Sequence, residues 1–89
     1  MPKTSKQLER YFKGAANHHR IDILFVVEKN DGASVEEISE LLQANFKTIS
    51  QHTHSLVRAG LLNKKYAGRQ VVHSLSPYGK FFVKFLKSF

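Results

Sequence analysis

Two helix patterns that follow each other almost without a break constrain the fold of this chain more than any other feature. The first covers about residues 35–43 and follows Ser34-Val35-Glu36-Glu37, a capping box in which the Ser and Glu side chains satisfy amides at a helix start. The second covers residues 45–59, with Asn45 as its cap and Gly60 just past its end. Because only Gln43 and Ala44 separate them, the two helices are predicted to form a helix-turn-helix unit.

The second helix of this unit divides its residues between two faces. At helical spacing one face collects Phe46, Ile49, Thr53, Leu56 and Val57, and the other collects Lys47, Thr48, Gln51, His54, Ser55 and Arg58. The polar face carries hydrogen-bond donors and no carboxylate, which suits it to the phosphates and base edges of a DNA groove. In a helix-turn-helix the second helix enters the major groove, although a solvated polar surface has the same pattern.

A strand pattern follows the helix-turn-helix. The segments 61–66 and 70–75 flank Ala67-Gly68-Arg69 and predict a β-hairpin. Its tip carries Lys64, Lys65, Arg69 and Gln70. A basic hairpin behind a recognition helix is typical of a wing, which tracks the phosphate backbone or reaches the minor groove. The alternative is an ordinary hairpin whose lysines protect an edge strand from pairing.

Three further helices are predicted around this unit. Residues 1–4 are expected to be frayed, and a narrow apolar stripe predicts a first helix over residues 5–15. Asn17 can cap a second helix over residues 18–29, whose apolar residues point in almost every direction and indicate a central element, with a buried strand as the competing interpretation. Ser76 and Pro77 begin a final helix.

The first and last helices carry more aromatic surface than one small core can absorb. We therefore predict that their apolar faces pack against a second copy of the chain. The residues expected in this dimer contact are Leu8, Tyr11, Phe12, Tyr78, Phe81, Phe82, Phe85 and Phe89. Packing within the chain, a membrane surface and the groove of another protein are the alternatives for the basic, amphipathic terminal helix.

The charge of the chain is unevenly distributed. The length of 89 residues predicts one domain, 1–89. The patterns above make this domain mostly α with a small β-hairpin (α+β), in the order α-α-α-α-β-β-α. The charge within this domain is distributed as follows. Residues 1–40 contain seven acidic groups and six Lys or Arg, whereas residues 41–89 contain eight Lys or Arg and no acid. This asymmetry indicates a polyanionic partner, since neutralising phosphates releases condensed counterions.

The sequence lacks the residues that several kinds of chemistry require. There is no Cys, and no phosphate-cradling Gly loop or nucleophile with an orienting base is found, so we predict no enzyme and no cofactor. His18 and His19 are adjacent and His52 and His54 are two apart, so neither pair has ligand spacing on a helix face, and a metal site would need His73 or a symmetry mate. The longest apolar run, 23–27, is too short for a membrane span. We expect a cytoplasmic protein that binds no metal and no membrane.

The predicted order of elements resembles that of the winged helix-turn-helix repressors of the ArsR type. The segment 12–24 resembles that family's entry to the second helix, where an Asp or Asn cap and an Arg three residues later precede an apolar run. Ile49-Ser50-Gln51-His52, followed by Leu56 and Ala59-Gly60-Leu61-Leu62, is similar to its recognition-helix signature. The resemblance covers almost the whole chain.

The resemblance implies specific contacts with DNA. Base or phosphate contacts are implied for Lys47, Thr48, Ser50, Gln51 and His52, with His54 close by, and wing contacts for Lys64, Lys65, Arg69 and Gln70. The Cys pair of the arsenic and cadmium sensors has no counterpart in residues 34–43, nor do the Asp, Glu and His of the zinc and nickel sensors in residues 76–89. Thr53 stands where the family usually has an apolar residue.

We therefore expect a homodimeric transcriptional regulator, most simply a repressor, that binds double-stranded DNA sequence-specifically. The alternatives are a winged-helix module that binds another protein and a non-specific protein that coats the chromosome.

Overall fold

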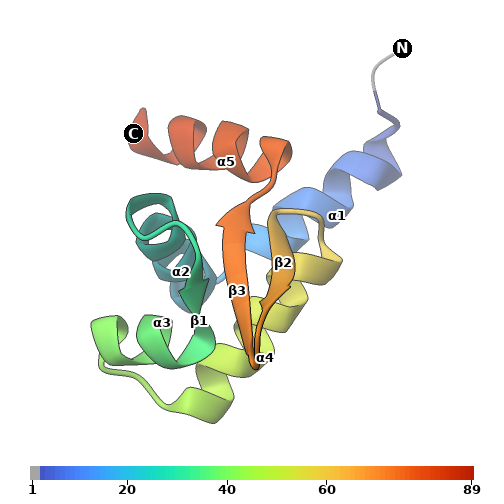
Figure 1. The fold of residues 1–89 in the computed structure, drawn as a ribbon. Helices are drawn as coiled ribbons and strands as arrows, with labels where there is room; N and C mark the ends of the chain where they lie inside the picture. Colours follow the sequence, from blue (N-terminus) through green and yellow to red (C-terminus); the bar gives the residue numbers. More distant parts are fainter. Residues whose placement is uncertain (1–2) are drawn as a thin grey trace.

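The computed structural model describes residues 3–89 and contains five helices and a small sheet (Figure 1). The elements are α1 (Ser5–Ala15), α2 (His18–Lys29), β1 (Ala33–Ser34), α3 (Val35–Leu42), α4 (Phe46–Arg58), β2 (Leu62–Ala67), β3 (Gln70–Leu75) and α5 (Pro77–Lys87). Every predicted helix is present, and the competing interpretation of residues 18–29 as a strand is wrong. The mostly α, winged helix-turn-helix fold is confirmed.

The predicted helix caps form as the local sequence indicates. The side chain of Asn17 accepts from the amides of His19 and Arg20, and Asn45 accepts from the amide of Thr48. The capping boxes begin α3 at Ser34 and, unexpectedly, α1 at Thr4. The prediction of a frayed end is therefore wrong for Thr4, and its first two residues, Met1 and Pro2, lie outside the described residues.

The sheet has one strand more than the sequence predicted. Its order is β1-β3-β2, with both pairs antiparallel. In the short strand β1, Ala33 pairs with His73 of β3. The Nδ1 atom of the buried His73 side chain lies 3.1 Å from the Ala33 carbonyl oxygen. In the hairpin Ala67 pairs with Gln70, so the loop is Gly68-Arg69, one residue shorter than expected. Gly68 has a φ of 64°, which a β-branched side chain would resist.

The core surrounds α2, as its apolar pattern predicted. This helix packs against α1, α3, α4 and α5 and against β3. Ile23, Leu24 and Val27 of α2 are buried with Ile38 of α3 and Leu56 of α4. The same core holds α4 and the hairpin in a fixed relationship, because Leu61, just before β2, and Leu62, its first residue, are also buried.

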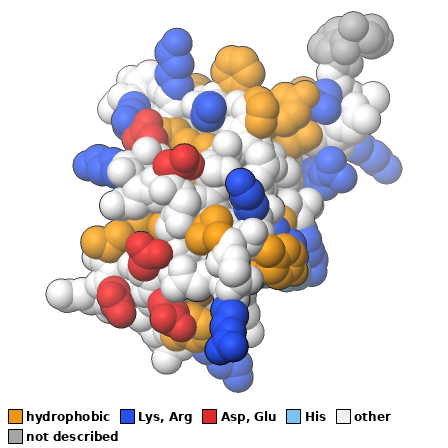
Figure 2. All heavy atoms as spheres, viewed as in Figure 1, with side chains coloured by type: hydrophobic (Ala, Val, Ile, Leu, Met, Phe, Trp, Pro, Cys, Tyr) orange, Lys and Arg blue, Asp and Glu red, His pale blue; other side chains and the backbone are white. Residues whose placement is uncertain are grey.

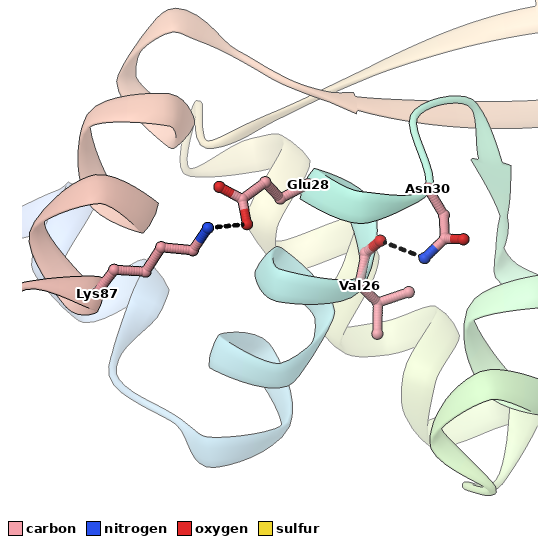
Figure 3. Close-up of polar contacts among 4 residues, drawn as sticks. All are labelled: Val26, Glu28, Asn30 and Lys87. Atoms are coloured by element: carbon pink, nitrogen blue, oxygen red, sulfur yellow. Dashed lines mark hydrogen bonds and ion pairs between the residues drawn. The ribbon is translucent and has the colours of Figure 1, made fainter.

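The final helix is tied to α2 by an ion pair. Lys87 Nζ lies 2.6 Å from Glu28 Oε1, and Asn30 closes α2 by donating from Nδ2 to the Val26 carbonyl oxygen at 2.9 Å (Figure 3). Helix α5 lies across one end of the molecule, with α1 beside it (Figure 1). Within residues 3–89, no helix is both long and apolar enough to cross a bilayer.

Candidate nucleic-acid interface

Helix α4 presents a polar face to solvent. Lys47, Gln51, His54 and Arg58 are exposed, whereas Thr48, Ser50 and His52 are partly buried. On the inner face Ile49, Thr53 and Leu56 are buried. Asn45 fixes the first turn of the helix. The outer face therefore has the donor-rich composition that the sequence indicated.

Phe46 lies differently from its predicted place on the packed face. Its side chain is 53% exposed at the first position of α4. With Arg69 and Gln70 of the hairpin and Glu36 of α3, it lines a surface hollow of about 260 Å³. The start of α4 and the tip of the hairpin therefore lie together at one end of the molecule (Figure 1).

His52 is less accessible than its neighbours on the polar face. Its Nδ1 accepts a hydrogen bond from Arg20 Nε at 3.1 Å, and its ring stacks on His19 with 5.3 Å between centroids. Burial lowers the pKa of His52, and the charges of Arg20, His19 and His18 lower it further. The His52 side chain therefore joins α4 to α2 as a neutral acceptor.

The hairpin supplies a second exposed basic element. Lys64, Lys65, Arg69 and Gln70 are all exposed, as is Tyr66 at 71%. In Figure 2 the acidic side chains lie on the left half of the view, whereas Lys and Arg side chains lie at the right and lower edges and also at the upper left. Neither α4 nor the hairpin itself carries an Asp or Glu side chain.

An apolar surface lies on α1 and α5. Phe81 and Phe89 are 70% and 91% exposed, and Leu8, Phe12, Tyr78 and Phe85 are also exposed. Phe12, Phe81, Phe82 and Phe85 line a groove of about 180 Å³. We call the surface formed by Leu8, Phe12, Phe81, Phe82, Phe85 and Phe89 the Phe face.

Part of the predicted dimer contact is used inside the chain. Tyr11 is buried, and its ring lies 5.0 Å from that of Tyr78. The ring of Phe82 is partly buried and lies 5.2 Å from that of Phe12. The core-facing residues of α5 are Gly79 and Val83, so most of the aromatic side chains remain on its outer side.

The histidines are closer together than the sequence suggested. The rings of His18 and His19 are 4.2 Å apart between centroids, and His52 stacks on His19, whereas His73 is buried in the sheet. In the part of the chain that the structure describes, no group of three or more His, Cys, Asp or Glu side chains is arranged to hold a metal ion.

Comparison with known proteins finds a matching family and several similar regulators. The family model described as "Bacterial regulatory protein, arsR family" matches residues 17–64. The transcriptional activator HlyU of Vibrio cholerae serotype O1 is 34% identical over 76 residues, which are 85% of this chain and 69% of that protein. A solved structure of HlyU from Vibrio cholerae has a TM-score of 0.83 at 31% identity and covers 97% of this chain and 94% of its own.

More distant structures share the fold. A homodimeric winged helix-turn-helix DNA-binding domain from Mycobacterium bovis has a TM-score of 0.83 at 21% identity, covering 93% of this chain and 77% of its own. The transcriptional repressor PagR of Bacillus anthracis has a TM-score of 0.82 at 23% identity, covering 91% and 93%.

Proposed function

This chain belongs to the ArsR family of bacterial regulatory proteins, and on that premise we propose that it binds a specific site in double-stranded DNA as a homodimer. It is a transcriptional regulator with a winged helix-turn-helix DNA-binding domain, and its family and relatives are regulators, not enzymes. In the proposed complex α4 enters the major groove, and the wing, residues 64–70, contacts the backbone or the minor groove.

The outer face of α4 is the observation that supports this proposal most strongly. Lys47, Gln51 and His54 are exposed on one helix that carries no carboxylate. Gln can form paired hydrogen bonds with adenine, and Lys can donate to guanine or to phosphate. Lys64 and Lys65 of the wing extend the same donor chemistry to the backbone.

The remaining predicted contacts of α4 have different roles in this proposal. Thr48 and Ser50 at the partly buried margin of the polar face are suited to phosphate contacts. His52 is engaged with Arg20 through Nδ1, so we propose that it positions α4. Arg69 and Gln70 at the hairpin tip complete the set.

The Phe face supports the homodimer. Exposed aromatic groups that line one groove are unusual on a monomer and are typical of an interaction surface. We propose that Phe12, Phe81 and Phe85 pack against their counterparts in a second copy, with Leu8, Phe82 and Phe89 around them. The Mycobacterium bovis domain of the same fold is described as homodimeric.

We propose repression as the direction of regulation. A dimer bound across a promoter blocks RNA polymerase, which requires no further contact. Among similar proteins, one relative is named an activator and one structure a repressor. Since bacterial chromosomes lie in the cytoplasm, the proposal also places the protein there.

Selection from random duplex DNA tests the proposal. The protein would be incubated with the library at near-physiological salt, the retained DNA sequenced, and the solution mass of the free protein measured. We expect a dimer and a two-fold symmetric site whose half-sites lie about 10 base pairs apart, or a multiple of that.

Two other results would replace the proposal. Retention without sequence enrichment, with a strong dependence on salt, would indicate a protein that coats DNA. No retention at all, together with a partner protein that co-purifies at high salt, would indicate a protein-interaction module.

A further inference from the structure

A second cationic surface lies beside α4, away from the wing. Arg10 and Lys13 of α1, Arg20 of α2 and Arg58 of α4 surround a surface hollow of about 350 Å³. We call it the four-cation hollow. Ser55 of α4 also lines it, and no Asp or Glu is among its lining residues. Neither the DNA-binding residues proposed above nor the dimer contact includes these four cations.

Close packing of α1 on α4 forms the base of the four-cation hollow. Gly14 and Ala59 both line it. A Cβ at Gly14 would collide with the Cβ of Ala59, so the two helices approach as closely as they do because residue 14 is glycine. Two hydrogen bonds hold the Arg20 guanidinium in place: its Nη1 donates to the Gly14 carbonyl oxygen at 3.1 Å, and its Nε donates to His52 Nδ1.

The guanidinium groups at this hollow have no anionic partner among residues 3–89. Arg20 donates to a carbonyl oxygen and an imidazole, and neither Arg10 nor Arg58 forms an ion pair. Lys13 lies 3.5 Å from Glu9, in a pair whose side chains are 76% and 59% exposed. Such an exposed pair is weak and is easily exchanged. Four like charges around one hollow repel each other, and a bound anion would remove that repulsion.

The four-cation hollow continues the polar face of α4. Gln51, Ser55 and Arg58 are spaced four and three residues apart and share one side of the helix. Helix α4 has 13 residues and is therefore about 20 Å long, whereas the major groove is about 12 Å wide. Because the helix is longer than the groove is wide, the end of α4 can reach a DNA strand that borders the groove. The wing lies near the start of α4, and the hollow lies at its end.

We propose that the four-cation hollow binds a backbone phosphate of the DNA strand that borders the groove at the end of α4. Arg58 and Arg10 contact the phosphate oxygens directly. Arg20, which is held by its hydrogen bonds to Gly14 and His52, adds a fixed positive charge to the hollow. This inference rests on the proposed DNA binding and adds a contact on the opposite side of the groove from the wing. It makes α1 a part of the DNA interface.

The test compares two double variants of equal charge. Arg10→Gln with Arg58→Gln removes two exposed cations of the hollow. Lys80→Gln with Lys84→Gln removes two exposed cations that line a different hollow, between α2, β3 and α5. Binding to a selected duplex of about 30 base pairs is measured over a range of salt concentrations. The probe is then remade with single uncharged methylphosphonate linkages placed in turn along each strand.

The expected result is a coupling between the arginines and one phosphate. The dependence of log affinity on log salt should decrease by about one per bound subunit for the arginine pair and remain near the wild-type value for the lysine pair. At one linkage in each half-site, neutralising the phosphate should weaken the wild type and the lysine pair but not the arginine pair. A merely structural role of the arginines would not produce a difference at a single linkage.

Three results would overturn the inference. One is an equal salt dependence in both double variants with no coupled linkage. In the second, the wild type binds inorganic tripolyphosphate, and the arginine double variant loses this binding but keeps wild-type DNA binding. That result would assign the hollow to a small anion. The third is a wild-type protein that binds no DNA, which would also remove the proposed function, whereas the first two leave it standing.

Discussion

The side chains of Arg20 and His52 join the beginning of α2 to the middle of α4, the proposed recognition helix. Arg20 Nε donates to His52 Nδ1 at 3.1 Å, across a separation of 32 residues in sequence. Only an unprotonated Nδ1 can accept this hydrogen bond. A proton on Nδ1 would place two donors against each other, and in the imidazolium two positive charges as well, so the contact requires a neutral imidazole with its proton on Nε2.

The first prediction concerns the dependence of folding stability on pH. Burial, and then the charges of Arg20, His19 and His18, lower the His52 pKa below the ordinary 6.5. Below that pH the unfolded chain binds a proton that the folded chain resists, so this contribution to stability is present above pH 6.5 and decreases as the pH falls toward the folded pKa. In His52→Asn an amide oxygen can accept from Arg20 without titrating.

Urea midpoints at about pH 7.5 and pH 5.5 test this prediction. The loss on acidification should be smaller in His52→Asn than in the wild type. His54→Asn, which changes an exposed histidine of the same helix, is the matched control and should retain the wild-type loss. An identical loss in wild type and His52→Asn would contradict the prediction.

Thr53 is the basis of a prediction about stability at constant pH. Its Oγ1 is buried and has no hydrogen-bond partner in the described part of the chain, at a position where an apolar residue is usual in the family. Thr53→Val keeps the shape and removes the unsatisfied hydroxyl, so the free energy of unfolding should rise by about 1 kcal/mol. Thr48→Val, at a partly exposed site of the same helix, should change it little. Destabilisation by Thr53→Val in urea unfolding would show that the hydroxyl is satisfied.

Base readout and backbone contact predict different effects of two alanine substitutions. Gln51→Ala should weaken binding to the selected site by about 1–3 kcal/mol and leave binding to random DNA nearly unchanged. Lys65→Ala should weaken both and reduce the salt dependence by about one. Fluorescence anisotropy with specific and random duplexes separates the two effects. If Gln51→Ala reduced both affinities equally, α4 would not read bases through this residue.

Helix boundaries were predictable because their signals are local. Asn17, Ser34, Asn45 and Ser76 each accept from an amide two or three residues later. A cap and its helix therefore lie within the same short segment of sequence. The hairpin is similarly local, since Gly68 permits its tight turn.

Contacts between distant segments were not predictable from these patterns. Strand β1 has two residues, too few for an alternating pattern, and it exists because β3 lies beside it. The aromatic side chain of Phe46 was assigned to the packed face by helical periodicity, but it belongs to the first turn of α4 and lines an open hollow together with Arg69 and Gln70 of the hairpin. The four-cation hollow joins three helices, so no single segment of the sequence indicates it.

A glycine in α5 gives a prediction opposite to intrinsic helix propensity. Gly79 is buried, and a Cβ there would collide with the carbonyl oxygen of Leu61, which accepts from the Ser76 amide at 3.1 Å. Gly to Ala normally stabilises a helix by about 1 kcal/mol, but Gly79→Ala should destabilise this fold by about 1–3 kcal/mol because backbone must move. Lys80→Ala, at the next and exposed position, should be nearly neutral. Equal thermal midpoints for the two variants would contradict this account.

The last prediction separates the Phe face from the core of the subunit. Phe81 and Phe85 are 70% and 49% exposed on α5, and the core on the other side of the helix is filled by Val83. Phe81→Ser with Phe85→Ser removes apolar area from the groove without opening a cavity in that core, so the helical content should persist while the dimer dissociates. Sedimentation equilibrium should give the mass of a monomer, and affinity for the symmetric site should fall because two half-sites are no longer bound together.

The control for this prediction changes two cations on the same helix. Lys80→Ser with Lys84→Ser alters exposed positions one residue before Phe81 and Phe85, and it should leave a dimer. If the phenylalanine variant remained dimeric with unchanged DNA affinity, the contact between copies would lie elsewhere on the surface. The Phe face would then be available to another protein, because its exposed aromatic groups would still lack a covering partner in the dimer.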